Sequence, residues 1–142
     1  MPKINVGRVV AGGVLAGAVL FLVNGIVNGA LLNSAFLEWA QGMGDRLHAP
    51  ARGVAMGLWT LMSLLYGIVG VWLYAGIRPR YGAGPKTALL AGLLLWIAGK
   101  FAVALDLIAL GILPTGLIVG QLLGGLVGIL AGVLLGARFY KE

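Results

Sequence analysis

The chain ends in an apolar run with regularly spaced glycines, TGLIVGQLLGGLVGILAGVLLGARFYKE, which covers residues 115–142. Glycine occupies every fourth position of this run, at Gly116, Gly120, Gly124, Gly128, Gly132 and Gly136. Because four residues exceed one helical turn by about 40°, the row winds slowly around a helix as a groove without side chains. Helices in lipid associate mainly through such close backbone approach. The run therefore predicts a transmembrane helix that packs closely against its neighbours.

The composition of the 142 residues is that of an integral membrane protein. Hydrophobic residues make up 61% of the chain and charged residues 10%, and the mean hydropathy is +1.04. A soluble domain has about 25% charged residues. The basic residues, which give a net charge of +6, flank the apolar runs, a pattern that favours anionic lipid headgroups over nucleic acid. Cysteine is absent, so the sequence offers neither a disulfide nor a thiolate metal ligand.

Four apolar runs predict an all-α fold, a four-helix transmembrane bundle that forms one domain over residues 1–142. The predicted spans are residues 9–32, 53–77, 87–112 and 116–138. The first run has about 24 residues and is too long for a cleaved signal peptide, whose apolar region has roughly 7–15. The connector of residues 77–86, IRPRYGAGPK, is predicted to be a loop because it is rich in proline and glycine. The short link before the last span makes the last two helices antiparallel neighbours.

Residues 33–50, NSAFLEWAQGMGDRLHAP, mix apolar and polar side chains at helical spacing. A helix over residues 34–47 would be too short to span a bilayer. We therefore expect a short helix that lies in the outer interface between the first two spans, with Trp39 at the level of the headgroups. The alternative is a loop with a single frayed turn.

The distribution of lysine and arginine predicts the orientation. One side of the predicted bundle carries Arg46 and Arg52, whereas the other carries Lys3, Arg8, Arg78, Arg80, Lys86, Arg138 and Lys141. By the positive-inside rule both termini are cytoplasmic, and we expect a bacterial inner membrane protein. On that side Arg78, Arg80 and Lys86 should meet anionic lipid headgroups.

The first span has its own row of glycines, at Gly13, Gly17, Gly25 and Gly29, and is the expected packing partner of the last span. Together with the last glycine row, these residues form the predicted helix-packing interface. Gly116 and Gly136 point about 200° apart on a helix, so the two ends of the last row are expected to meet different neighbours.

Lys100 is a charged residue within the third apolar run. It follows Lys86 by 14 residues, which places it about 21 Å from the cytoplasmic edge of a core about 30 Å thick. Counting in the same way puts Asn24, Thr60 and Gln121 at a comparable depth, so we expect these residues and Lys100 to form an intramembrane polar layer. An ionisable group at this depth indicates a functional site. The alternative is that Lys100 extends outward toward Glu38, Asp45 or headgroups.

The remaining polar residues suggest no chemistry of their own. Asn24 and Asn28 share a helix face, and interhelical hydrogen bonds would explain both. Asp106 is interpreted as a solvated carboxylate near the outer interface, with a proton or cation contact at a pore mouth as the alternative. His48 is the single histidine, so we expect no metal site and no cofactor. No catalytic set or phosphate-binding motif is present, and we expect no catalytic residues.

The segment VWLYAGIRPRYGAGPKTALLAG, residues 71–92, together with the basic start and four apolar runs, resembles a group of small bacterial four-span membrane proteins of unknown function. Its most specific part is Trp72 to Thr87. The resemblance implies the topology and a bacterial source, and it implies no site residues.

These patterns favour a non-enzymatic membrane protein that packs through glycine-lined helices, as an accessory subunit of a larger complex or as a homo-oligomer. The alternative is a small transporter or channel in which the polar layer around Lys100 lines a path for an anion. An enzyme that acts on lipid is a third hypothesis. The expected partners are the lipid bilayer, anionic lipids at the cytoplasmic face, and other membrane-protein subunits or a second copy, but no nucleic acid.

Overall fold

The computed structural model describes residues 4–140, and every regular element in that range is a helix. The α-helices are α1 (Val6–Ile26), α2 (Asn33–Met43), α3 (Arg52–Tyr81), α4 (Pro85–Trp96), α5 (Ala102–Leu110) and α6 (Thr115–Phe139). Two π-helical segments join consecutive helices, η1 (Val27–Leu31) after α1 and η3 (Ile97–Phe101) between α4 and α5, and η2 (Gly44–Arg46) is a 3-10 turn.

Four continuous rods are long and apolar enough to cross a membrane, as the sequence predicts. They are Val6–Leu31, Arg52–Tyr81, Pro85–Leu110 and Thr115–Phe139. The shortest has 25 residues, about 37 Å at 1.5 Å per residue, which exceeds a hydrocarbon core of about 30 Å. The all-helical fold with four long apolar helices is therefore confirmed.

The structure corrects the predicted loop of residues 77–86. Helix α3 continues through Pro79 to Tyr81, and only Gly82, Ala83 and Gly84 separate it from α4. A proline removes the hydrogen bond to the carbonyl four residues earlier, but in the final turn few later bonds depend on it. The helix stops at Gly82, whose φ of +83° suits glycine best.

The sequence patterns did not predict the two π-helical segments. In η1 the amide of Leu32 donates to the carbonyl of Val27, five residues earlier, at 2.9 Å. The side-chain amide of Asn28 donates to the carbonyl of Asn24 in the same helix, also at 2.9 Å. The expected interhelical role of Asn28 is thus wrong, because its side chain satisfies a carbonyl beside the π-helical turn of its own rod.

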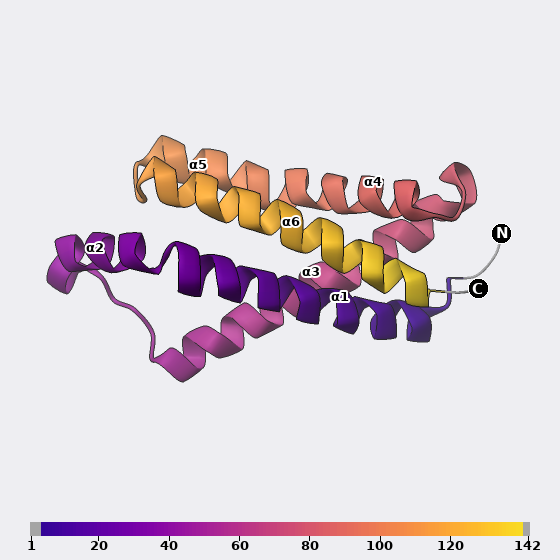
Figure 1. Ribbon diagram of the computed structural model, residues 1–142, viewed down its shortest axis with the longest axis horizontal. Coiled ribbons are helices and arrows are strands. Elements are labelled where there is room, and N and C mark those ends of the chain that lie inside the picture. Colours follow the sequence, from indigo (N-terminus) through magenta and orange to yellow (C-terminus); the bar gives the residue numbers. More distant parts are fainter. Residues whose placement is uncertain (1–3, 141–142) are drawn as a thin grey trace.

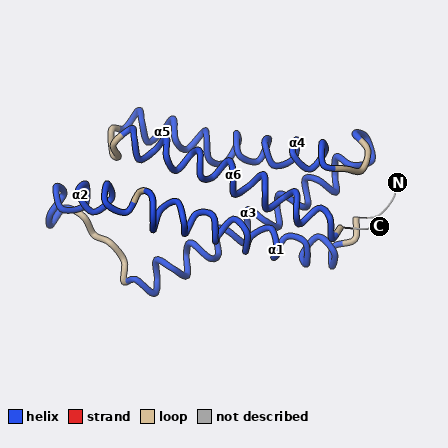
Figure 2. The backbone as a smooth tube through the Cα atoms, in the orientation of Figure 1, coloured by secondary structure: helices blue, strands red, loops and turns tan. Residues whose placement is uncertain are grey.

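Helix α1 lies at the centre of the packing, against α3 on one side and α6 on the other (Figure 1). Helix α4 packs on α6 and α3, and the rod of α4 and α5 runs antiparallel to α6 as predicted (Figure 2). The core is built mostly from small and aliphatic residues, including Val9, Ala16, Leu20, Val71, Ala91, Ile129 and Val133.

The two ends of the bundle differ. At the end that holds both termini, called here the termini end, α1, α3, α4 and α6 lie together (Figure 1). Toward the opposite end, the far end, α3 crosses α1 and diverges, and α2 continues beyond α1 past the α5–α6 turn (Figure 1). Helix α2 has no buried residue, and its place in a membrane interface stays a prediction.

Candidate functional site

The glycine row of α6 forms the contact with α1, where the two backbones touch. A Cβ placed on Gly132 would lie 2.5 Å from the carbonyl oxygen of Ala16, and one placed on Gly136 would lie 2.5 Å from that of Gly12. Real Cβ atoms do not approach an oxygen this closely, so both positions require glycine in this packing. The last row and the first span are partners, as predicted.

Farther along the same contact, side chains of the first rod fill the groove. The nearest atoms to a Cβ built on each glycine, at 2.7–2.8 Å, belong to Leu32 at Gly120, Val27 at Gly124 and Leu20 at Gly128. A Cβ on Gly136 would also lie 2.7 Å from a methyl carbon of Val71 in α3, whereas Gly116 at the other end of the row has no described neighbour within 4 Å, so the expectation that these two ends meet different neighbours stays a prediction. Between them, Gly120 through Gly132 face the first rod and Leu32, which follows it. The reason is that a helix crossing obliquely stays over an inclined row of fourth residues.

Gly13 and Gly17 of α1 pack on α3 and not on α6, which corrects the face predicted for this contact. A Cβ on Gly13 would lie 2.5 Å from the Cα of Ile68, and one on Gly17 would lie 2.7 Å from the Cα of Leu64. Gly67 of α3 completes the contact, since a Cβ there would meet the backbones of both α1 glycines.

Two small residues adjacent to those glycines, Gly12 and Ala16, meet α6 instead. Helix α1 therefore carries two neighbouring small-residue rows, one for each partner. Sequence reasoning singled out neither Gly12 nor Gly67, although the four-residue spacing of Gly12 and Ala16 is a signal of this kind.

Three residues of the predicted interface make no such contact. A Cβ placed on Gly25, Gly29 or Gly116 would have no described atom of another element within 4 Å. The structure therefore does not use these glycines for packing within the chain, and a contact with a second molecule stays a prediction for them.

Lys100 lies in η3, between α3 and α6. The methylene stem of Lys100 passes over Gly125, with carbon atoms 3.6–3.8 Å from a Cβ built there. Its Nζ atom lies 4.0 Å from the sulfur of Met62 and 5.3 Å from the centre of the Tyr66 ring. The ammonium group is thus held against the middle of α3 by a cation–π contact. The structure does not show the outward extension toward Glu38 or Asp45.

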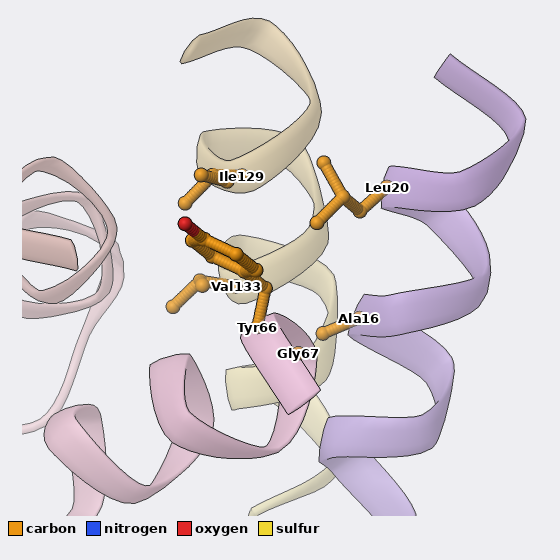
Figure 3. Close-up of a pocket in the computed structure, with 6 residues that line it drawn as sticks. All are labelled: Ala16, Leu20, Tyr66, Gly67, Ile129 and Val133. Carbon is orange, nitrogen blue, oxygen red and sulfur yellow. The ribbon is translucent and has the colours of Figure 1, made fainter. Parts of the chain in front are cut away.

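Tyr66 occupies the junction of three helices. Figure 3 shows its ring beside Ile129 and Val133 of α6, with Ala16 and Leu20 of α1 on the other side. Its hydroxyl oxygen lies 2.5 Å from the Cβ position of Gly99 in η3, so a side chain at Gly99 would displace the ring. The π-helical segment therefore places both Gly99 and Lys100 next to one aromatic ring.

The four residues of the predicted polar layer do not form one cluster. Thr60 is exposed, and its hydroxyl donates to the carbonyl of Met56 in its own helix at 2.8 Å. Gln121 is one turn from Gly125 on α6, whereas Asn24 lies on α1 beside η1. The neighbours of Lys100 are instead Met62 and Tyr66, which the sequence patterns did not indicate.

A second polar group closes the termini end. The hydroxyl of Tyr140 accepts a hydrogen bond from the amide of Asn5 at 3.3 Å, and its ring packs edge-on against Tyr74 at 6.2 Å. The guanidinium of Arg78 lies 5.7 Å from the Tyr140 ring centre. Tyr140 therefore ties the start of the first rod to the ends of α3 and α6.

Beside this group lies a cavity of about 160 Å³ between α3, α4 and α6. Its lining residues are Tyr74, Gly84, Pro85, Ala88, Leu134, Ala137 and Arg138. Arg80 and Lys86, which were predicted to face headgroups, are exposed at the same end. Arg78, the third residue predicted to face headgroups, is instead half-buried against Tyr140.

The other titratable residues stand apart from both groups. Asp106 is exposed on α5, and His48 is exposed, with its Nδ1 atom 3.2 Å from the carbonyl oxygen of Arg46. Within residues 4–140 no group of three or more His, Cys, Asp or Glu side chains could hold a metal ion.

The fold and these contacts define a class, a small four-rod helical protein whose rods are packed through glycine and have the length and composition of membrane spans. Comparison with known protein families, with characterised proteins and with solved structures gives no match.

Proposed function

We propose that this chain is a non-enzymatic integral membrane protein that acts by associating with another membrane-spanning chain, either a second copy or a subunit of a larger complex. The far-end half of α3 is exposed on nearly every side, and the supporting observation is one face of it that carries two glycines. This exposed α3 face comprises Gly53, Val54, Gly57, Leu58, Leu61 and Leu65.

The residues of the exposed α3 face fall within about 140° of one another at 100° per residue. Its four aliphatic side chains are each at least 54% exposed, and a Cβ on Gly53 or Gly57 would meet no described atom within 4 Å. Two glycines four residues apart beside a stripe of leucine and valine are typical of packed transmembrane helices. Any apolar helix face can contact lipid, but the two glycines on this face favour close contact with a neighbouring helix.

The internal packing of the bundle uses most of the predicted interface. Gly120 through Gly136 face α1, and Gly13 and Gly17 face α3. Among the glycines that remain available, Gly25 and Gly29 lie in the far-end half of the first rod and Gly53 and Gly57 in that of α3, where the two diverge. Association at the far end would cover both.

The proposed location is a bacterial inner membrane, with both termini cytoplasmic. The termini end carries Arg8, Arg78, Arg80, Lys86 and Arg138, whereas Arg46 and Arg52 lie at the far end. This asymmetry supports the orientation by the positive-inside rule. The far end, with α2 and the exposed α3 face, would then lie toward the outer leaflet.

Native mass spectrometry after mild detergent extraction from the source membrane tests the association. We expect a mass that corresponds to a homo-oligomer or to a fixed stoichiometry with other subunits. Replacing Gly57 with leucine should reduce the associated fraction at least tenfold, because a bulky side chain prevents close backbone approach. Replacing Gly76 with leucine is the matched control, since Gly76 is open on the same helix. A monomer in the wild type would contradict the proposal.

A second candidate function is transport of a small anion, which the position of Lys100 favours. Its ammonium group has a sulfur atom and an aromatic ring as its neighbours, and it makes no ion pair with a described residue. An ionisable group within an apolar span is costly, and such groups mark ion or substrate pathways in membrane proteins.

Replacing Lys100 with methionine distinguishes the two candidates. For a transporter, flux of chloride or nitrate into proteoliposomes should fall at least tenfold, because the attracting charge is lost. For an associating protein, the native mass should be unchanged. Lys86→Met, in the exposed first turn of α4, is the control and should leave flux near the wild-type value. Equal flux in the wild type and the Lys100 variant would contradict transport through this site.

A further inference from the structure

The cavity at the termini end has the size and lining of a site for part of a lipid molecule. Its volume of about 160 Å³ is far larger than the roughly 10–15 Å³ that one water molecule requires. Most of its lining is apolar, from Ala88 of α4 and from Leu134 and Ala137 of α6. An apolar cavity favours a hydrocarbon group over water.

The depth of the cavity matches the boundary between headgroups and acyl chains. Leu134 precedes the end of α6 at Phe139 by five residues, which is about 7.5 Å along the helix. On the opposite wall, Pro85 and Ala88 belong to the first turn of α4. The boundary region lies about 5–10 Å below a membrane surface. A phospholipid in the proposed membrane would present its glycerol and upper chain at this level.

The charge at the rim of the cavity is positive. Arg138 lines it directly, and Arg80 and Lys86 are exposed on the neighbouring ends of α3 and α4. The described carboxylates, those of Glu38, Asp45 and Asp106, all lie on elements at the far end. An anionic headgroup would therefore find a complementary field at this site, whereas a zwitterionic one would gain much less.

We propose that this cavity binds one anionic phospholipid of the cytoplasmic leaflet, with the phosphate at Arg138 and the glycerol and upper acyl chain between α4 and α6. The inference rests on the proposed membrane insertion, but not on the proposed association. A free phosphate ion shares the headgroup chemistry, yet it would leave the apolar lining without an occupant. The lipid is therefore the occupant that both the charge and the lining favour.

The test uses the full chain in detergent, titrated with a phosphatidylglycerol or with the phosphatidylcholine of the same acyl chains, and counts bound lipids by native mass spectrometry. We expect one phosphatidylglycerol per chain to survive activation that removes phosphatidylcholine. Arg138→Gln should weaken this binding about fivefold, the factor for one basic residue near an anionic headgroup. Ala137→Val should weaken it as well, because the added methyl groups occupy the cavity.

Arg52→Gln is the matched control, since it removes the same charge at the far end. Equal losses in the Arg138 and Arg52 variants would overturn the site, because they would indicate general surface attraction. Displacement of the lipid by millimolar inorganic phosphate would also overturn it, in favour of a free anion. Since Arg138 is exposed, its replacement leaves the fold intact. Bound lipid increases the measured mass by the mass of one lipid per chain, whereas association increases it by the mass of whole chains. The two proposals are therefore tested independently in the same spectrum.

Discussion

Replacing Gly67 with alanine should lower the free energy of unfolding by about 3 kcal/mol, the upper part of the range for overpacking a core. A Cβ at this position would meet the backbones of Gly13 and Gly17. Backbone atoms of two helices cannot rotate away as a side chain can, so α1 and α3 must move apart. That separation would also open the junction where Tyr66 contacts α1 and α6.

The matched control is Gly76→Ala in the same helix. A Cβ on Gly76 would have no described neighbour within 4 Å, and alanine favours a helix over glycine by about 1 kcal/mol. The two substitutions are therefore expected to change stability in opposite directions. Unfolding in mixed micelles of increasing denaturing detergent, followed by circular dichroism, measures both. A Gly67 variant as stable as the Gly76 variant would show that α1 and α3 do not pack as described.

Replacing Gly132 with alanine should lower the free energy of unfolding by about 2 kcal/mol. The new methyl group would lie 2.5 Å from the carbonyl oxygen of Ala16, which is bonded within α1 and cannot yield. Helices α1 and α6 would then separate along the whole glycine groove. A larger side chain, as in Gly132→Leu, should prevent folding of the bundle.

Gly116→Ala tests the same row at a position that is open. Since a Cβ on Gly116 has no described atom of another element within 4 Å, and the residue lies in the first turn of α6 where helix propensity counts less than in the interior at Gly76, this substitution should leave stability within about 0.5 kcal/mol of the wild type. Circular dichroism at increasing temperature in detergent compares the two variants directly. If Gly116 and Gly132 respond alike, the row is not an internal packing surface along most of its length.

Much of the architecture could be predicted because it follows from local chemistry. An uninterrupted apolar run of more than 20 residues can adopt few structures in lipid. A helix is favoured because it satisfies all of its backbone hydrogen bonds within the segment. Helix ends near Pro85 and Thr115 follow from the residues at those positions. The continuation of α3 to Tyr81 was missed because Pro79 reads as a helix breaker, although in a final turn it removes little.

For the site around Lys100, the sequence could indicate individual residues but not which of them lie together. Lys100 stands out by its charge in an apolar run, but its neighbours Met62 and Tyr66 lie on another helix and share no pattern with it. The predicted polar layer relied on depth alone. Depth fixes a position along a helix and leaves the direction around it open, which is why Thr60 could match in depth and still face outward.

The sequence by itself determined four apolar helices, the antiparallel order of the last two and the identity of α1 and α6 as partners. Spacing and hydropathy act within one helix, and those features need nothing more. Only the tertiary structure decided that Gly13 and Gly17 face α3 while Gly12 and Ala16 face α6, and that Lys100 lies over Tyr66. The physical reason is that adjacent residues point about 100° apart, so choosing a face depends on how three backbones fit together at once.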